Sequence, residues 1–286
     1  MVRKNQLVVA ALLLSIGSSL SGAISATDKS AYTLFNRTPE SQLRELSTDR
    51  PDVTESPYTV DAGWGQLEMD LFAYTRDREK PAGTDIKVSA LSLATINLKF
   101  GLTPAIDLQT VLEPYTVVHV HDWVSDTREK ISGFGDVTSR LKINFWGNDG
   151  GDSAFGLMPF VKWPTNQNGL GNDSVEGGLI VPVAFNLGAG WDMGAMTEFD
   201  VVRNEADTGY ALDWVNSITF SHDIAGKLGG YAELATTLTH GRDLASFDCG
   251  LTYGVNRHLQ FDAGINIGLT RATEDLTVFT GVSLRF

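Results

Sequence analysis

The sequence predicts an all-β protein, a transmembrane antiparallel up-and-down β-barrel of about 12 strands. Three observations support this prediction. The chain begins with the layout of a secretory signal, most of it is organised in runs of alternating apolar and polar side chains, and its last residue is aromatic. Alternation with a period of two is typical of strands that have one apolar and one polar face.

The first 26 residues form the predicted signal peptide. Two basic residues, Arg3 and Lys4, precede eight consecutive apolar residues, and small residues follow up to position 26. This order is typical of a secretory signal, and we expect cleavage after Ala23 or Ala26. A membrane anchor is the alternative, but a spanning helix needs about 20 apolar residues. We therefore expect export through the periplasm to the outer membrane of a Gram-negative bacterium.

The last ten residues, 277–286, show the alternation clearly. One face carries Val282, Leu284 and Phe286, and the other carries Arg285. A membrane-crossing strand has about 9–11 residues, which matches this length. A terminal aromatic residue on the apolar face resembles the assembly signal of bacterial outer-membrane barrels. We therefore expect Val282, Leu284 and Phe286 to be recognised by the barrel-assembly machinery.

Similar runs upstream predict twelve strands in total. Short connectors such as 101–105 and 148–151 are assigned to periplasmic turns, and the longer ones at 77–87, 119–133 and 164–174 to outer loops. The expected strands are 66–76, 89–100, 106–117, 134–146, 153–163, 175–186, 191–202, 210–221, 228–238, 246–254, 259–268 and 277–286.

A soluble β-sandwich is the alternative fold, because its strands alternate as well. Most runs here are about ten residues long, whereas common strands have about 5–6. Aromatic residues also stand near strand ends on the apolar face, where rings settle at a membrane interface. They are Phe145, Trp163, Trp191 and Phe286. Both observations favour a barrel in contact with outer-membrane lipid.

A leader, residues 27–65, precedes the barrel of residues 66–286. Its prolines hold a dense polar motif extended and remove backbone donors. Two arrangements are open: the leader docks on the periplasmic rim, which we favour, or it folds back into the barrel and pairs with charges there. The motif consists of Asp49, Arg50, Pro51, Asp52, Glu55 and Pro57.

The polar faces of the predicted strands supply the candidate functional residues. Charged side chains are costly in an apolar interior unless they are paired, so we place them in the lumen. Twelve strands enclose a backbone diameter of about 24 Å, which leaves either a narrow bore or a filled interior. The lumen-facing candidates are Asp107, Gln109, Glu113, Asp136, Arg140, Lys142, Glu198, Asp200, Glu233, Asp248, Asp262 and Arg285.

The composition argues against several other functions. With 22 basic and 35 acidic residues and a net charge of −13, the chain is a poor partner for nucleic acid. Its one cysteine, Cys249, excludes a disulfide framework and a four-cysteine zinc site. Cys249 stands on an apolar strand face, where it acts as a small hydrophobic residue.

Candidates for catalysis and metal binding are weak. Ser221 and His222 are neighbours in a predicted strand, so their side chains point to opposite faces, whereas a hydrolase needs them in contact. His119 and His121 share a face, but two histidines without further ligands do not make a metal site. We therefore predict no enzyme activity, no metal and no cofactor.

Eight segments match a family pattern in order along about 240 residues. They are 48–57, 62–63, 66–68, 101–104, 133–137, 140–142, 161–165 and 169–171. On these segments the chain resembles the outer-membrane transporter family named for the MetA pathway of phenol degradation. One departure is Trp64, where that pattern leads us to expect a histidine or another polar residue.

The resemblance implies export, a barrel and a role in moving small aromatic or hydrophobic molecules. We therefore predict an outer-membrane transporter or channel for such solutes. Two alternatives stay open. The protein could be a closed structural or adhesion barrel whose outer loops bind partners, or an outer-membrane acyl hydrolase.

Overall fold

The computed structural model describes residues 28–79, 83–204, 208–239 and 241–286. The predicted signal peptide, residues 1–26, lies outside these described residues. One short 3-10 helix, η1, spans Glu40–Gln42. The strands are β1 (Gly65–Glu79), β2 (Ile86–Leu93), β3 (Ile96–Thr103), β4 (Ile106–Leu112), β5 (Tyr115–Asp122), β6 (Thr127–Gly133), β7 (Val137–Trp146), β8 (Ser153–Trp163), β9 (Glu176–Gly188), β10 (Trp191–Arg203), β11 (Tyr210–Ala225), β12 (Leu228–Leu238), β13 (Asp243–Asn256), β14 (Leu259–Gly268) and β15 (Leu276–Arg285).

Three pairs of these strands are the two halves of one barrel strand. β2 and β3 are separated only by Ala94 and Thr95, β4 and β5 by Glu113 and Pro114, and β6 and β7 by residues 134–136. Ala94 has a φ of 55°, and Pro114 cannot donate to a neighbouring strand. With each pair counted once, the barrel has twelve strands, as the sequence predicts.

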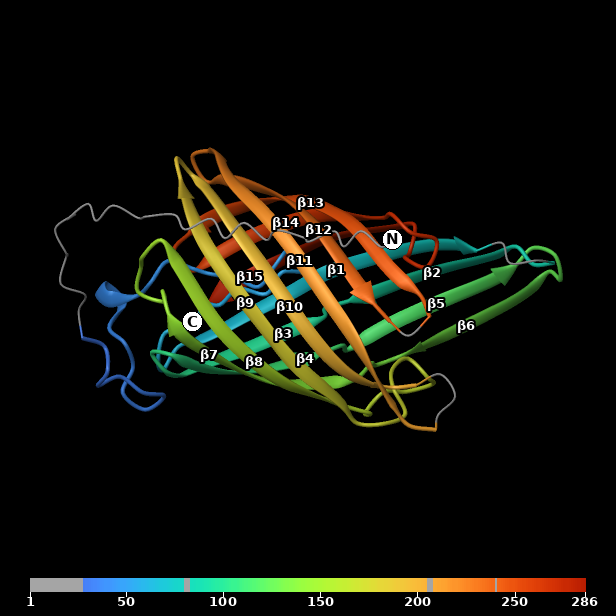
Figure 1. The fold of residues 1–286 in the computed structure, drawn as a ribbon, viewed down its shortest axis with the longest axis horizontal. Helices are drawn as coiled ribbons and strands as arrows, with labels where there is room; N and C mark the ends of the chain where they lie inside the picture. The colour runs from blue at the N-terminus through green and yellow to red at the C-terminus, as the bar shows by residue number, and fades with distance from the viewer. Residues whose placement is uncertain (1–27, 80–82, 205–207, 240) are drawn as a thin grey trace, which may run out of the picture.

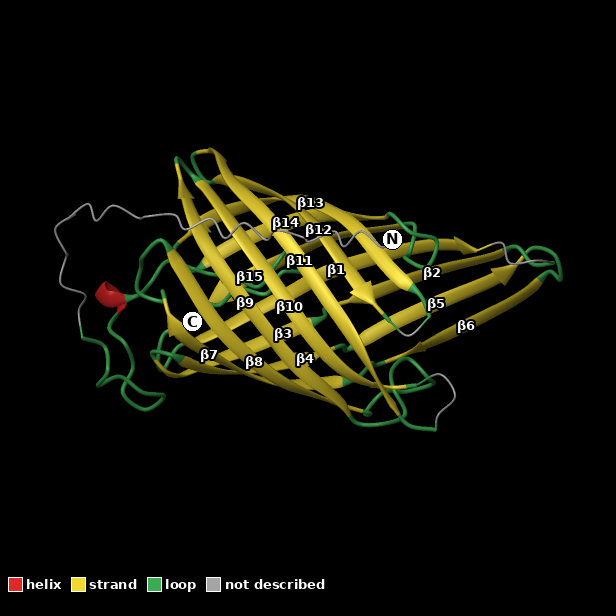
Figure 2. Cartoon of the chain, viewed as in Figure 1, coloured by secondary structure: helices red, strands yellow, loops and turns green. Residues whose placement is uncertain are grey.

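The sheet closes on itself. Each strand is antiparallel to its neighbours, and β1 completes the circle by pairing with β15, with Gln66 opposite Arg285. At this seam Gly65 and Phe286 exchange backbone hydrogen bonds of 2.9 and 2.8 Å. A Cβ on Gly65 would lie 2.6 Å from the Phe286 ring, so the close approach requires glycine. Figure 2 shows the resulting closed, almost entirely stranded barrel.

Two outer loops expected from the sequence are largely strand instead. β1 and β2 stay paired out to Glu79 and Ile86, and β5 and β6 are joined by a turn at 123–126. The two hairpins pair through β2 and β5 and extend beyond one end of the barrel (Figure 1). Their strand character was missed because both faces of a ribbon outside the membrane can be polar, which removes the alternation.

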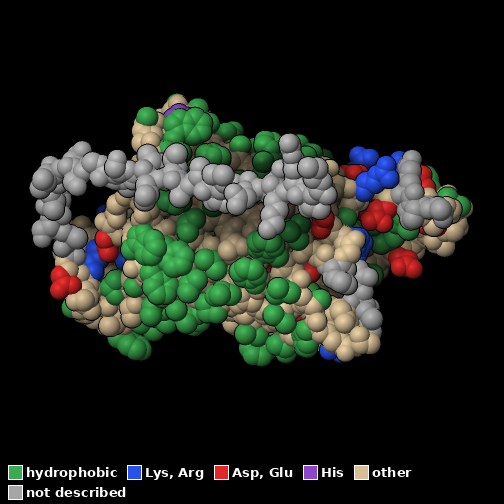
Figure 3. Space-filling view, viewed as in Figure 1, with side chains coloured by type: hydrophobic (Ala, Val, Ile, Leu, Met, Phe, Trp, Pro, Cys, Tyr) green, Lys and Arg blue, Asp and Glu red, His purple; other side chains and the backbone are tan. Residues whose placement is uncertain are grey.

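Apolar side chains cover the outside of the barrel. Leu108, Leu234 and Leu251 are 43%, 50% and 50% exposed, and hydrophobic side chains gather over the barrel wall in Figure 3. The aromatic residues expected at the interfaces are exposed as well: Phe145, Trp163, Trp191 and Phe286. Because a closed barrel satisfies its backbone internally, such an exterior suits lipid. The fold is that of a transmembrane β-barrel.

Among the described residues, no helix is both long enough and apolar enough to cross a membrane.

Candidate functional site

The leader, described from residue 28 to residue 64, runs into the barrel from the end that carries the short turns, which the sequence assigns to the periplasm (Figure 1). Residues 49–60, which we call the lumen segment, contact inward-facing side chains of β1, β3, β4, β7, β11, β12 and β14. This segment therefore lies inside the barrel. The sequence analysis favours docking on the rim instead, and the structure differs from that expectation at these residues. Its partners are distant in the chain, so the sequence pattern could not reveal them.

Asp49 is the most heavily paired charge of the lumen segment. Its carboxylate lies 2.5 Å from the ammonium groups of both Lys99 (β3) and Lys142 (β7). Lys99 also pairs with Glu68 (β1) at 2.5 Å. These four side chains belong to residues that are at most 8% exposed. Each charge therefore depends on its partners for the stabilisation that water would otherwise supply.

Arg50 joins the lumen segment to the closing seam of the barrel. Its guanidinium donates to Asp70 (β1) at 2.6 Å and to Asp262 (β14) at 2.8 Å. Gly281 of β15 lies next to the guanidinium, and a side chain at this position would collide with it. The close approach of Arg50 therefore requires glycine here.

Thr54 and Glu55 attach the lumen segment to two sides of the barrel. The backbone N–H of Thr54 donates to Glu233 (β12) at 2.8 Å, and the Thr54 hydroxyl lies 2.7 Å from that of Ser217 (β11). Arg140 (β7) donates to Glu55 at 2.5 Å. Since β7 and β12 stand five positions apart in a circle of twelve strands, the lumen segment crosses the bore.

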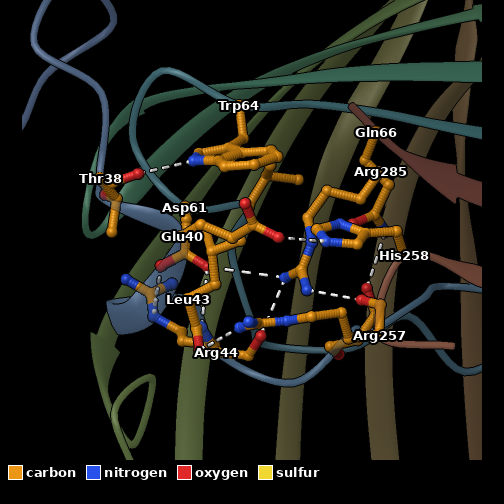
Figure 4. A network of polar contacts seen from close by, with 12 residues as sticks. Thr38, Glu40, Leu43, Arg44, Asp61, Trp64, Gln66, Arg257, His258 and Arg285 are labelled. Carbon is orange, nitrogen blue, oxygen red and sulfur yellow. Dashed lines mark hydrogen bonds and ion pairs between the residues drawn. The ribbon is translucent and has the colours of Figure 1, made fainter.

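Trp64 anchors the leader at the periplasmic rim (Figure 4). Its indole N–H donates to the carbonyl of Thr38 at 2.8 Å, and its ring stacks on His258 with 5.7 Å between centroids. The Arg37 guanidinium lies 3.7 Å from the centroid of the indole. Trp64, which departs from the expected polar pattern, is thus 4% exposed and packs against the groups just described.

Arg44, Asp61 and Arg285 form the charged part of the rim network (Figure 4). Asp61 lies 3.3 Å from Arg44 and 3.7 Å from Arg285, and Arg285 donates to the Arg44 carbonyl at 2.9 Å. Asp149, in the turn after β7, pairs with Lys29 and Arg44 at 2.6 and 3.1 Å. Burial alone raises the pKa of Asp149, but these two cations outweigh it, so the pKa lies below its usual value.

The twelve lumen-facing candidates lie on the inner side of the barrel wall, and their exposed fractions differ. Those that are at most 4% exposed are Asp107, Gln109, Asp136, Lys142, Glu233, Asp248, Asp262 and Arg285. Those of intermediate exposure are Glu113, Arg140, Glu198 and Asp200. Their part in transport stays a prediction.

Sequence reasoning missed Glu68, Asp70 and Lys99, although Glu68 and Asp70 share the polar face of an alternating run.

Asp136 organises an outer loop. Its carboxylate accepts hydrogen bonds from the backbone N–H groups of Thr165, Asn166 and Asn172 at 3.0, 3.1 and 2.7 Å. These bonds hold the connection between β8 and β9 against the outer end of β7. A carboxylate used in this way has a structural task at its position.

A cavity of about 810 Å³ lies between the lumen segment and the barrel wall. It is lined by the leader, by the periplasmic turn at 147–151 and by parts of β9, β10, β11 and β12. Rim residues such as Lys29, Arg44 and Arg285 line it as well, which places it in the periplasmic half of the lumen.

An apolar patch lies on the inner wall of β8–β11, farther from the periplasmic end than the cavity. It consists of Met158, Ile180 and Met196, with Phe160 and Val215 packed against them. Met158, Ile180 and Met196 are 0%, 1% and 5% exposed. The backbone N–H of Glu55 lies 3.4 Å from the Met196 sulfur, so the patch abuts the lumen segment.

The candidates for catalysis and metal binding are engaged in other contacts. His222 is 2.8 Å from the carbonyl of Gly190, and His121 is 3.1 Å from Asp126. Cys249 is a free thiol of intermediate exposure. In the part of the chain that the structure describes, no three His, Cys, Asp or Glu side chains are grouped so that they could hold a metal ion.

A family model described as "Putative MetA-pathway of phenol degradation" matches residues 48–286. The chain belongs to this family. The match begins immediately before the lumen segment, so the MetA-pathway family model covers both that segment and the barrel. The rim part of the leader, residues 28–47, precedes the match.

One solved structure shares the barrel fold of this MetA-pathway family member, and a second has a lower similarity score. An outer membrane channel from Pseudomonas putida F1 is similar with a TM-score of 0.58 and 12% identity, over 84% of this chain and 100% of that chain. The NanC porin has a TM-score of 0.49 and 8% identity, over 76% and 98% of the two chains. At this identity the first likeness shows the fold alone. No curated protein matches the chain.

Proposed function

We propose that this protein is an outer-membrane channel for small hydrophobic molecules, aromatic ones among them. The apolar patch on the inner wall carries the proposal, because it is buried beside the lumen segment and becomes a hydrophobic contact surface in an otherwise charged lumen when that segment moves aside. The cavity beside the lumen segment is large enough for a small solute on its way through. Membership in the MetA-pathway family supports the same class of cargo.

The proposal also covers partners and chemistry. Outer-membrane lipid surrounds the barrel, and the assembly machinery recognises Val282, Leu284 and Phe286 at the chain end. Nucleic acid is not a partner of this acidic barrel. We propose no enzyme activity, because Ser221 and His222 are neighbours on β11 and face opposite sides of the wall.

Uptake of neutral phenol by liposomes that contain the refolded mature protein tests the channel. We expect uptake above that of empty liposomes. Ile180→Asn places a polar group in the apolar patch and should slow uptake several-fold, whereas Ile180→Val keeps the patch apolar and should leave the rate near that of the wild type. Equal uptake rates for the two variants would show that the solute does not pass along the apolar patch.

A closed structural barrel is the second candidate function. The observation that favours it is the lumen segment itself, which crosses the bore and is held by buried ion pairs. In that case the outer loops would bind partners and the interior would serve stability. If the protein shows no uptake and no conductance above those of empty membranes, the result supports the closed barrel over the channel.

A further inference from the structure

A row of oxygen-bearing side chains crosses four strands of the lumen wall. Thr219 (β11) is opposite Glu233 (β12), Glu233 is opposite Asp248 (β13), and Asp248 is opposite Asn266 (β14). Directly opposed residues have Cβ atoms about 4.5–5.5 Å apart, so the four side chains are neighbours. Glu233 and Asp248 are 1% and 0% exposed. We call Thr219, Glu233, Asp248 and Asn266 the oxygen row.

The oxygen row places two acids side by side. Like charges at opposed positions are destabilising, and burial makes this worse. Some other acids inside the barrel have basic partners, as Asp262 has Arg50 and Glu68 has Lys99. Within the described residues, by contrast, neither Glu233 nor Asp248 forms an ion pair with a Lys or Arg. Asp52 of the lumen segment adds a further acid that interacts with Glu233.

Buried oxygen atoms without partners lie in the same place. Oδ1 of Asp248 and Oδ1 of Asn266 have no hydrogen-bond partner among the described residues, and the same holds for the hydroxyl of Tyr231. Tyr231 is 8% exposed and stands two residues before Glu233, on the same face of β12. Buried polar atoms are almost always paired, so this concentration of unpaired oxygens indicates a ligand.

We propose that the oxygen row binds a hard divalent cation of the Ca²⁺ class. Ca²⁺ prefers carboxylate and amide oxygens, and the two acids match its charge. Because only two acids belong to the row, Asn266, the hydroxyl groups and water complete the ligand set. Transition metals, which favour nitrogen and sulfur donors, do not suit this set.

The bound cation also stabilises the lumen segment. Glu233 accepts the backbone N–H groups of Val53 and Thr54 at 2.7 and 2.8 Å. A cation between Glu233 and Asp248 offsets the repulsion between these two acids and so favours the arrangement in which Glu233 accepts these bonds. The site is independent of whether the barrel conducts solute.

Calorimetric titration of Ca²⁺ into the refolded, chelator-treated mature protein tests the inference. We expect one saturable site per chain. Asp248→Asn should weaken binding about ten-fold or more, since it removes a charged ligand but preserves shape. Asn266→Leu should weaken binding while leaving both charges in place. Asp152→Asn, in an exposed periplasmic turn, is the matched control and should bind as the wild type does.

Two results would overturn the site. One is the absence of saturable Ca²⁺ binding by folded protein, with folding checked by heat-modifiable migration on a gel. The other is unchanged affinity in Asp248→Asn together with loss of affinity in Asp213→Asn, which would move the cation to the opposed acids Asp200 and Asp213.

Discussion

At the scale of single residues, Asp49 is the side chain on which the lumen segment most depends. One carboxylate serves two buried ammonium groups, Lys99 and Lys142, and also accepts a hydrogen bond from the Ser56 hydroxyl at 2.8 Å. Removal of one member of a buried ion pair costs about 3–5 kcal/mol, because the remaining charge is left without compensation.

Asp49→Asn should therefore loosen the lumen segment. We expect trypsin to cleave the variant after a leader residue such as Arg44 much faster than it cleaves the wild type, as measured by mass spectrometry of the folded protein. Asp152→Asn is the control, because Asp152 lies in an exposed turn and forms no ion pair with the described residues of the leader. Equal protection of both variants would contradict the role assigned to Asp49.

At the scale of strands, β13 and β14 show how the two faces differ. Cys249 and Ile265 are opposed on the lipid side, and Asp248 and Asn266 are opposed on the lumen side. A shift of one residue in register would exchange these faces, so the alternation determines which residues meet lipid.

The two faces of β14 should respond differently to the same substitution. Ile265→Arg exposes a charge to lipid and should destabilise the barrel by about 2–4 kcal/mol near the membrane midplane. Asn266→Arg places the same side chain beside Asp248 and should cost far less. Urea-induced unfolding in lipid bilayers measures both, and equal costs would mean that the faces are assigned incorrectly.

At the scale of the whole molecule, the lumen segment occupies the interior of the barrel. It crosses the barrel between the periplasmic cavity and the outer half, and Thr54 ties it to Ser217 at 2.7 Å. Under the proposed function, solute passes when this part of the segment moves away from β11.

A disulfide between the two positions should block transport. In a Cys249→Ala background, Thr54→Cys combined with Ser217→Cys brings two thiols close enough to bond. We expect uptake of neutral phenol to stop on oxidation and to return on reduction, while either single cysteine variant transports in both states. Uptake that persists in the oxidised double variant would show a path around a fixed segment.

The parts of the fold that could be predicted from sequence are those that depend on neighbouring residues. Alternation such as that at Val282, Leu284 and Phe286, together with the length of each run, was sufficient to predict the barrel strands, the face of each strand that meets lipid, and the number of strands. The two protruding hairpins were missed for the same reason, since alternation weakens where both faces meet water. The candidate site was predictable only as a set of inward-facing polar residues.

The sequence by itself determined a closed barrel with an apolar exterior and a charged interior, because strand period and length are local properties of the chain. Only the tertiary structure decided which interior charges belong together. Arg50 meets Asp262 across 212 residues, and Asp49 meets Lys142 across 93. Such pairings depend on which strands the closed sheet brings around the leader, and Coulomb attraction selects partners only after that geometry exists.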